Sequence, residues 1–403
     1  MKIAYVFYDR PNYSAGPRIN AMRLLPIFAR RGYDVTAIIG YHSDCPAQKY
    51  LERSGVTVRA MSWPRFCLDQ VNWLAETLSE IDPDVFVPNI STSGCYAARY
   101  LREAGRPTIA GHLSNDEYNW GLAKRFCQRA DEWAVSGLFC MGSELGDTVR
   151  AWNPSRSHVV DICHGVPLSD LRSDCTGPLR LVYAGRIEDC QKRVSDLARA
   201  ILPILQTYPD AQMKFIGDGS RRSSLEELFE TERLADRVTF TGHVEPDVVQ
   251  REIVWGNILV LLSEYEGVPG AIMDGMACGM VPVCLDIGGG VRELVVHQYT
   301  GLLVKNREAE FQSAMHRLAE NESLRRDLSL NAVRHIADHF SLAAAADKWE
   351  QLFEYLMQSA GPRRDLVFPD PIVLPPPSAG IDREDIRRPL SLSRKFTRIW
   401  RKT

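Results

Sequence analysis

Short apolar runs of strand length alternate with amphipathic runs of helix length, and this alternation runs through the chain twice. The first pass predicts strands at 3–8, 34–39, 56–61, 84–90, 107–112, 133–143 and 158–166, with helices at 18–32, 68–81, 94–104 and 120–133. The second predicts strands at 179–186, 212–219, 237–242, 257–263, 281–286 and 301–304, with helices at 194–208, 224–234, 270–279, 308–338 and 341–358. Strands separated by helices pair in parallel, so each pass predicts a doubly wound α/β domain.

The polar run RSDCTGPL at 172–179 separates the two passes and reads as a linker, because it carries Gly and Pro. We therefore expect domains at 1–172 and 177–342, followed by a helix at 343–358 that crosses back to the first domain. Residues 359–403 form a proline-rich and basic tail. Its part at 361–380 holds six prolines and should run extended over the surface or be flexible. Pro203 predicts a kink or a break in the helix at 194–208.

Composition excludes several classes of protein. Of the 403 residues, 45% are hydrophobic and 25% are charged, which is the balance of a soluble globular protein. A net charge of −3 excludes a polyanion binder of the histone kind. The ten cysteines are scattered without a C-x-x-C pair, and the opening MKIAYVFYD reads as a strand rather than a signal peptide. We therefore expect reduced thiols in a cytoplasmic protein.

The stretch EYEGVPGAIMDGMACG at 264–279 follows an apolar strand and frames a glycine-proline loop with two acids, Glu266 and Asp274. Pro269 fixes its own φ, and a helix that begins near Gly270 leaves its first N–H groups without intrahelical partners. Such a helix start attracts anions, and the glycines leave room for a phosphate. Asp274 is expected within about the first turn, where its charge would suit the helix dipole. For Asp274 alone, this structural explanation is favoured.

Basic side chains follow the first strand of the same half, in GRIEDCQKR at 185–193. Arg186 presents a fork that matches two phosphate oxygens, and Lys192 and Arg193 add positive charge. In an open α/β sheet, the loops after the carboxyl ends of the strands meet along one edge, where ligands bind. Basic groups beside a helix start at that edge predict a diphosphate site. A solvated charge cluster is the alternative, and it explains less well why a glycine precedes the arginine.

The order of these motifs resembles that of retaining glycosyltransferases of the two-Rossmann (GT-B) class, family 4, also called glycosyl transferases group 1. In the second half, LVYAGRIEDCQK, FIGDGS, VTFTGHV, EGVPGAIMDGMACG and VPVCLDIGGGVRELVVHQYTGLLV match motifs of the family. In the first half, SAGPRINAMRLLPIFARRGYDV, TIAGH and CHGVP match as well, so the resemblance covers residues 1–358 in order. It departs where Asp274 replaces a glutamate, where Lys192 sits one place later than usual, and where His164 replaces an asparagine.

The resemblance implies two Rossmann-like domains that face each other across a cleft, and it implies roles for the site residues. Arg186 and Lys192 would bind the nucleotide's diphosphate and neutralise the leaving group. Glu266 would bind hydroxyls of the donor sugar, and His112 would touch that sugar near the transfer point. Asp274 would reach the ribose, and His243 would lie near the base. The donor-binding residues would be Gly16, Gly185, Gly217, His243, Val268, Gly270, Ala271, Ile272 and Asp274.

The resemblance also implies a reaction: transfer of a sugar from a nucleotide-diphosphate sugar to an acceptor hydroxyl with retention of configuration, in glycan, polysaccharide or glycoconjugate biosynthesis. It implies no side-chain nucleophile, no metal and no cofactor. The D-x-D at 82–84 reads as ordinary turn-to-strand sequence, and His335 and His339 have no evident third zinc ligand. The alternatives are a nucleotide-sugar epimerase on the same frame and a non-catalytic relative that binds nucleotide sugars. The presence of Arg186, Lys192 and Glu266 argues against the latter.

Partners follow from the same reasoning. The acceptor is expected to be a glycan, a lipid-linked glycan or a small molecule, read by first-domain loops such as 9–20 and 112–122, and no nucleic-acid partner is expected. In the basic tail, Leu392, Phe396, Ile399 and Trp400 fall on one helical face. Such a tail suits an anionic membrane surface, and hence a peripheral position on the inner face of the membrane. Packing on the protein, or a solvated end, is an equally open reading.

Overall fold

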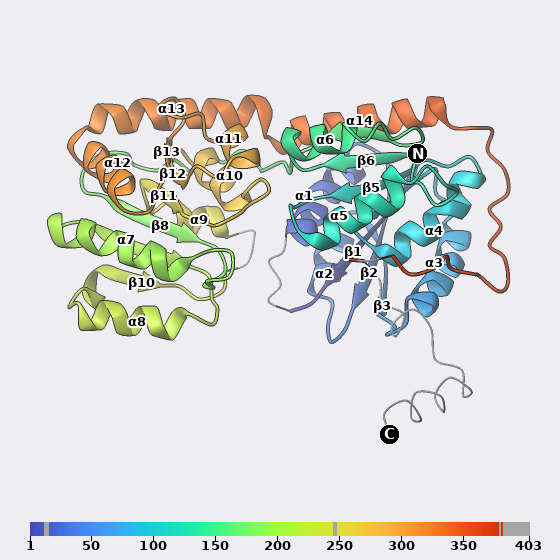
Figure 1. The fold of residues 1–403 in the computed structure, drawn as a ribbon, viewed down its shortest axis with the longest axis horizontal. Coiled ribbons are helices and arrows are strands. Elements are labelled where there is room, and N and C mark those ends of the chain that lie inside the picture. The colour runs from blue at the N-terminus through green and yellow to red at the C-terminus, as the bar shows by residue number, and fades with distance from the viewer. Residues whose placement is uncertain (12–15, 245–247, 379, 382–403) are drawn as a thin grey trace, which may run out of the picture. The chain divides into compact units, whose positions relative to one another are not determined.

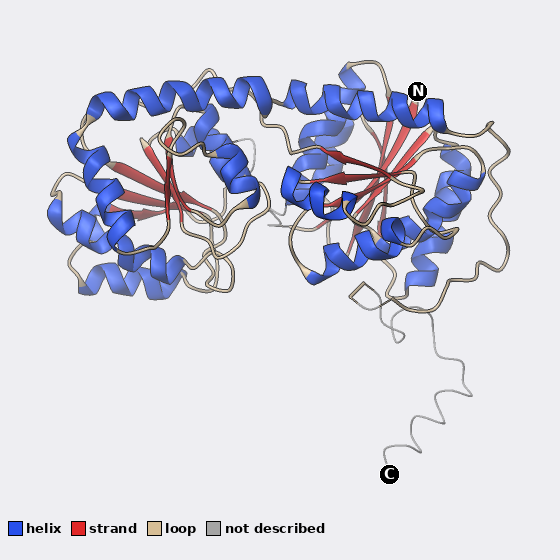
Figure 2. Cartoon of the chain, turned by 45° about the horizontal axis from the view of Figure 1, so that its top comes forward, coloured by secondary structure: helices blue, strands red, loops and turns tan. Residues whose placement is uncertain are grey.

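The computed structural model describes residues 1–11, 16–244, 248–378 and 380–381. By their internal contacts these residues form two compact units. The first contains Met1–Met141, Leu145–Ile162 and the chain from Lys348 onward, and the second contains Gly142–Glu144 and Cys163–Asp347. Each unit is built around one parallel sheet, and helices enclose the strands of each sheet (Figure 1 and Figure 2).

The sheet of the first unit has seven parallel strands in the order β3-β2-β1-β4-β5-β6-β7. They are β1 (Lys2–Asp9), β2 (Asp34–Tyr41), β3 (Thr57–Ser62), β4 (Val85–Asn89), β5 (Thr108–His112), β6 (Gly137–Cys140) and β7 (His158–Asp161). Strand β1 pairs with β2 on one side and with β4 on the other. Every residue of β4 and β5 is buried, because helices cover both faces of the sheet.

The helices between these strands are α1 (Gly16–Arg30), α2 (Pro46–Arg53), α3 (Cys67–Ile81), α4 (Thr92–Glu103), α5 (Glu117–Ala123) and α6 (Ser143–Arg150). Ser91 caps α4 and Asp116 caps α5, each by accepting a backbone N–H of the first turn. Helices α2 and α6 were not predicted, because eight residues are too few for a clear helical period. The helix predicted at 120–133 begins earlier, and its continuation as a π-helical turn ends at Gln128.

The sheet of the second unit has six parallel strands in the order β10-β9-β8-β11-β12-β13. They are β8 (Arg180–Ala184), β9 (Gln212–Ile216), β10 (Val238–Phe240), β11 (Ile258–Leu261), β12 (Val281–Leu285) and β13 (Leu302–Val304). Together the two sheets confirm the predicted α/β class with two doubly wound domains.

The helices of the second unit are α7 (Val194–Thr207), α8 (Arg222–Thr231), α9 (Val249–Ile253), α10 (Gly270–Ala277), α11 (Gly289–Leu294), α12 (Ala309–Glu320) and α13 (Glu322–His339), with a 3-10 turn at Ala235–Arg237. Of the kink or break predicted at Pro203, the break does not occur, because α7 runs through this residue, and the kink stays a prediction. Pro203 lies on the exposed face, whereas Leu197, Ile201 and Ile204 bury the opposite face in the core. This packing holds the helix together despite the hydrogen bond that proline cannot make. Across the described residues, no helix is both long and apolar enough to cross a membrane.

Helix α14 (Leu342–Ser359) begins in the second unit, and its residues from Lys348 belong to the first. Within the first unit, Trp349 packs against Tyr5 and Phe139 at ring-centroid distances of 6.5 and 4.7 Å. Phe353 contacts Phe28 at 5.5 Å. These aromatic contacts make the second half of α14 part of the first unit's core.

After α14 the chain continues as an extended segment, residues 361–378 and 380–381, which we call the strap; in Figure 1 it is the red segment that passes α4 and α3. Arg363 pairs with Asp82 and Asp84, the two acids of the D-x-D, so these carboxylates bind an arginine. Burial raises the pKa of Asp82, but hydrogen bonds from Arg363 and Arg106 outweigh it and leave this pKa below its ordinary value. The backbone N–H of Arg364 donates to Ala104 O at 3.0 Å. These contacts hold the start of the strap on the surface of the first unit, which is one of the two arrangements predicted for it.

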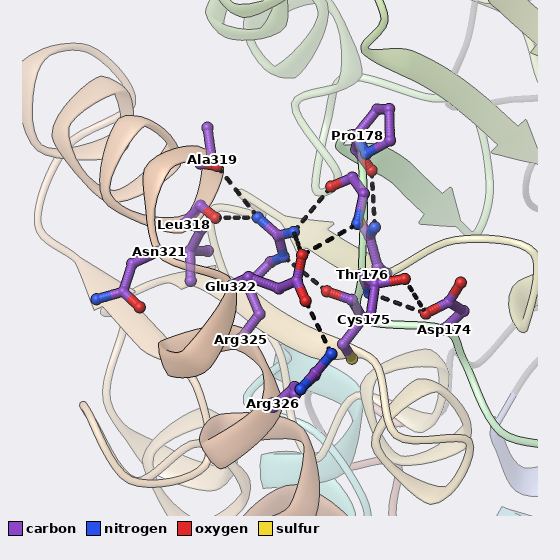
Figure 3. Close-up of polar contacts among 12 residues, drawn as sticks. Asp174, Cys175, Thr176, Pro178, Leu318, Ala319, Asn321, Glu322, Arg325 and Arg326 are labelled. Atoms are coloured by element: carbon purple, nitrogen blue, oxygen red, sulfur yellow. Dashed lines mark hydrogen bonds and ion pairs between the residues drawn. The ribbon is translucent and has the colours of Figure 1, made fainter.

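A buried arginine, Arg325 on α13, fixes the segment that leads into β8 (Figure 3). Its side chain donates to the carbonyls of Cys175 and Gly177 in that segment, at 2.9 and 2.8 Å. It also donates to the carbonyls of Leu318 and Ala319 at the end of α12. One guanidinium therefore satisfies the orphan carbonyls of a helix end and holds the start of the second sheet against it.

Candidate functional site

Strands β8 and β11 lie side by side in the second sheet, and the chain leaves them toward opposite edges. Loops that follow such a pair of strands turn apart and leave a crevice, which is the usual ligand site of an open α/β sheet. Here the two loops are 185–193 and 262–269, the segments that the sequence assigned to a diphosphate and a sugar. A backbone hydrogen bond of 2.8 Å from Glu264 N to Gln191 O ties them together.

An ion pair joins the two loops at this point. Lys192 Nζ donates to Glu266 Oε1 at 2.5 Å, and the Glu266 side chain is only 7% exposed. Gln191 Nε2 donates to the neighbouring carbonyl of Tyr265 at 3.0 Å and lies 3.4 Å from Glu266 Oε2. The structure thus brings together Lys192 and Glu266, which the sequence had named separately.

Arg186 lies in the same loop with its side chain 56% exposed. Its guanidinium donates to Glu188 Oε2 at 2.7 Å and to Gln191 Oε1 at 2.9 Å. Its backbone carbonyl accepts a hydrogen bond of 2.6 Å from the hydroxyl of Tyr183, a residue of β8. Burial raises the pKa of Tyr183 well above its ordinary value, and the charge of Glu266 raises it further. The phenol therefore stays protonated and holds the main chain of Arg186 in place, while the exposed guanidinium bonds to Glu188 and Gln191.

Gln191 is a residue that the sequence reasoning missed. It accepts from Arg186 and donates toward Glu266, so it connects two of the predicted site residues. A glutamine beside Lys192 has no charge or motif that would single it out in the sequence. Only its place between two charged residues in the fold shows that it orders them.

Helix α10 begins at Gly270, next to the second loop, as predicted. A Cβ placed on Gly270 would meet nothing within 4 Å, so open space lies beside the first turn. Val268 and Ile272 are buried and pack the loop and the helix into the unit. Helix geometry leaves the N–H groups of Gly270 and Ala271 without intrahelical partners, which is the property an anion site needs.

Asp274 lies just past the first turn of α10, close to where the sequence placed it. Asp274 is the fifth residue of α10, which has no acid in its first turn, and its side chain is buried. Its Oδ1 accepts a hydrogen bond of 3.2 Å from Gln250 Nε2, a residue of α9. A helix-dipole role therefore does not explain this acid, which instead joins α10 to α9. The role toward a ribose remains a prediction.

The glycines that end β8 and β9 have a structural reason of their own. Gly217 has φ 132°, and a Cβ there would lie 2.0 Å from the carbonyl oxygen of Gly185. Its N–H donates to Gly242 O at 2.9 Å, and Gly185 N donates to Ile216 O at the same distance. Close packing of neighbouring loops thus accounts for Gly217 without a ligand, and its donor-binding role stays a prediction.

Two further predicted donor-binding residues, His243 and Gly16, lie outside the two loops 185–193 and 262–269. His243 is exposed after β10 in the second unit. Gly16 is the first residue of α1, and the loop residues 12–15 before it lie outside the described part, as does the basic tail from residue 382.

His112 ends β5 in the first unit and is fully buried, with its ring 4.3 Å from that of Trp120. Burial lowers the pKa of His112 to about 4, although Asp116 opposes this shift. Neither ring nitrogen of His112 has a hydrogen-bond partner within the described residues. The imidazole is therefore neutral at physiological pH with both ring nitrogens buried, and its contact with a donor sugar stays a prediction.

Comparison with known proteins finds a family match within the second unit. Residues 178–321 match the model of the family "Glycosyl transferases group 1". The chain is 32% identical over 169 residues to an alpha-D-kanosaminyltransferase of Streptomyces kanamyceticus, a match that covers 42% of this chain and 43% of that relative's length. It is 24% identical over 284 residues to a Campylobacter jejuni N-acetyl-D-galactosaminyltransferase named for an undecaprenol-linked acceptor, covering 69% of this chain and 77% of that protein.

The fold is shared over nearly the whole chain. The crystal structure of HepE from Anabaena in complex with UDP-glucose has a TM-score of 0.71 at 17% identity, covering 88% of this chain and all of that one. The two parallel-sheet domains are those of the GT-B fold. The resemblance to group 1 glycosyltransferases that the motifs indicated is thus confirmed, and residues 178–321 are the part of this chain that matches the family model.

Proposed function

We propose that the protein transfers a sugar from a nucleotide-diphosphate sugar to an acceptor hydroxyl, with retention of configuration, in the synthesis of a glycan or glycoconjugate. The observation that carries this proposal is the Lys192–Glu266 pair at the switch point of the second sheet, beside the start of α10. Cationic, anionic and helix-terminus groups meet there at one edge of the sheet. A nucleotide-diphosphate sugar offers a complementary group to each.

Charge neutralisation is the main chemical task of the site. When the bond between the anomeric carbon and the phosphate oxygen breaks, negative charge grows on the leaving diphosphate. Arg186 and Lys192 would stabilise that charge, and the first N–H groups of α10 would add to it. Arg186 suits this role because its exposed guanidinium, bonded to Glu188 and Gln191 in the described part of the chain, can exchange these partners for phosphate oxygens.

Glu266 would bind hydroxyls of the donor sugar, because a buried carboxylate accepts hydrogen bonds well and is already oriented by Lys192. The acceptor oxygen would attack the anomeric carbon on the face that the phosphate leaves, and the acceptor's proton would pass to the departing phosphate oxygen. This route needs no side-chain nucleophile and retains the configuration of the sugar. The complex of HepE with UDP-glucose supports a donor of this class, and the Campylobacter relative supports a glycan acceptor.

The test is release of nucleotide from a panel of UDP-, GDP- and ADP-sugars, measured for the full-length protein without an acceptor. We expect one donor to be hydrolysed slowly by the wild type. Arg186→Ala should lower that rate by a factor that corresponds to about 2–4 kcal/mol, the range for loss of one donor that stabilises developing negative charge. Product configuration, read by NMR of the anomeric proton, tests retention.

Arg199→Ala is the matched control, since Arg199 is an exposed arginine of the same unit whose pair with Asp196 lies on the surface of α7. Its rate should equal that of the wild type. Equal rates for Arg186→Ala and Arg199→Ala would contradict the assignment.

A further inference from the structure

The first unit has its own switch point, and a cavity of about 310 Å³ lies there. Strands β1 and β4 are neighbours, and the chain continues from them toward opposite edges of the sheet. Tyr8 from β1, Gly40 from β2 and Asn89 from β4 line the cavity near the carboxyl ends of their strands. It therefore occupies the position where an open α/β sheet binds ligands, and its volume is near the lower end of the ~300–1,000 Å³ of small-molecule sites.

Asn89, the last residue of β4, lines this cavity and has a buried amide side chain. It is 1% exposed, and neither its amide oxygen nor its amide nitrogen has a hydrogen-bond partner among the described residues. Its backbone is left-handed, with φ 54°, which is uncommon outside glycine. A buried amide without partners destabilises the fold, so such a group needs an explanation. Because an amide both donates and accepts, a hydroxyl group is a complementary partner.

More polar and aromatic groups line the same cavity. Ser91 and Ser93, at the start of α4, share a hydrogen bond of 3.1 Å. Thr92 Oγ1 and the hydroxyl of Tyr118 are 3.0 Å apart. The rings of Phe7, Tyr8, Trp63 and Tyr118 contribute apolar lining. A few placed polar groups within aromatic walls suit a ring that carries hydroxyls at its edge and C–H groups on its faces.

Trp63 is fixed in this wall by the sequence around it. A Cβ on Gly40 would lie 2.2 Å from a carbon of the Trp63 indole, so the indole can take its place only because residue 40 has no side chain. The backbone N–H of Trp63 donates to Tyr41 O at 2.6 Å. Its ring meets that of Trp73 edge to face, at 6.2 Å. The aromatic wall is therefore formed before any ligand arrives.

The strap supplies another part of the wall. Ile381 lines the cavity and is buried, although it follows the last helix by more than twenty positions. Ile372 is also buried, and the ring of Phe368 lies 5.2 Å from that of Tyr100 on α4. Together with the Arg363 ion pairs, these contacts place Ile381 where it narrows the cavity.

We propose that this cavity binds the acceptor as a hydroxylated ring, a sugar or a cyclitol, through the Asn89 amide and the hydroxyls at the start of α4, with Trp63 against the ring and Ile381 as the closing wall. The assignment of the ring as the acceptor rests on the proposed function. The binding site itself does not, because every residue that forms it belongs to the first unit.

The experiment measures binding by the full-length protein without donor, using saturation-transfer NMR followed by calorimetry. The probes are glucose, N-acetylglucosamine and myo-inositol, with cyclohexanol as a ring of similar size that has one hydroxyl. We expect at least one hydroxylated probe to bind and cyclohexanol to bind less well. Asn89→Gly should weaken binding by roughly tenfold or more, since it removes the amide while a glycine keeps the left-handed backbone.

A second variant, Trp63→Ala, should also weaken binding, whereas Trp152→Ala should not, because Trp152 is a half-buried tryptophan of the same unit that packs on Trp120 outside the cavity. Absence of binding by all three hydroxylated probes would overturn the proposal. So would equal affinity of the wild type, Asn89→Gly and Trp63→Ala, or binding of cyclohexanol as tight as that of the best probe. Donor hydrolysis by the wild type and Arg186→Ala reports separately on the proposed function, so either idea can fail alone.

Discussion

Replacing Arg325 by methionine tests how a single buried side chain holds the second unit together. Arg325 is 2% exposed and donates to four backbone carbonyls, two in the segment before β8 and two at the end of α12. Burial lowers its pKa, yet an arginine stays charged in proteins. Methionine has a similar length and fills the same space without a donor, so the change removes hydrogen bonds rather than packing.

The magnitude follows from the fate of the carbonyls. All four carbonyls lose a charged donor; the bonds to Cys175 and Leu318 are buried, whereas those to Gly177 and Ala319 are partly buried. A buried acceptor left without a partner costs ~1–3 kcal/mol. Removal of a buried charge recovers part of its desolvation cost. We expect a net loss of about 3 kcal/mol, which is about two powers of ten in a local opening constant.

Hydrogen exchange by mass spectrometry is the suitable assay, because a chain with two units does not unfold in one step and local opening must be resolved. Peptides that cover 173–184 should exchange about a hundredfold faster in Arg325→Met, while peptides of the first sheet should not change.

Arg326→Met is the matched control for this experiment. Arg326 is the neighbouring arginine, 60% exposed and paired with Glu322 at 2.9 Å. A surface pair of this kind contributes at most ~1 kcal/mol. If the peptides that cover 173–184 exchange at the same rate in Arg325→Met and Arg326→Met, the Arg325 guanidinium does not anchor this segment and the reasoning is refuted.

Three further predictions concern the two units. Glu266→Gln should lower donor hydrolysis by at least about tenfold in the nucleotide-release assay, with little change in melting temperature, because it removes the carboxylate charge but keeps the size; a rate equal to wild type would contradict the sugar-binding role. Gly217→Ala should lower the free energy of unfolding of the second unit by about 2 kcal/mol or more in urea, since the new Cβ would meet the Gly185 carbonyl. Gly270→Ala should change that free energy by less than about 0.5 kcal/mol. Similar urea midpoints for the two variants would refute this prediction. Burial holds the pKa of His112 at about 4 against an ordinary 6.5, so the stability that the neutral ring contributes is full above pH 6.5 and falls as pH drops toward 4. In His112→Phe the midpoint of urea unfolding should therefore depend less on pH between 6.5 and 4. The same pH dependence in variant and wild type would argue against this.

Most of the fold could be predicted because the strands are apolar runs between helices with a clear period. Strand β1 pairs over its whole length with β2, and the prediction for that run was off by only one residue at each end. The predictions failed for elements that are stabilised mainly by tertiary packing rather than by their local sequence. Helix α2 has two buried residues in eight, so its apolar stripe is too short to detect. Pro203 breaks a helix on local grounds, but packing of α7 on the sheet outweighs that preference.

The candidate site divides in the same way. Arg186, Lys192 and Glu266 are recognisable from sequence because their charges stand next to glycine-rich loops at strand ends. Asp274 was placed within about one turn of the helix start, but the sequence could not show that its side chain is buried and hydrogen-bonded to Gln250. The cavity beside Asn89 could not be predicted, since it depends on how β1 to β4 meet and on a segment at the far end of the chain.

The interleaving of the two units has a consequence for synthesis of the protein. The second unit is made of residues up to Asp347, so its chain is complete while the first unit still lacks Trp349, Phe353 and the strap. The first unit begins translation earlier but can finish its core only after Trp349 reaches Tyr5 and Phe139. The usual order, in which N-terminal domains fold first on the ribosome, is therefore inverted for the last step. Nascent chains stalled after residue 347 should be protease-resistant in the second unit and susceptible in the first.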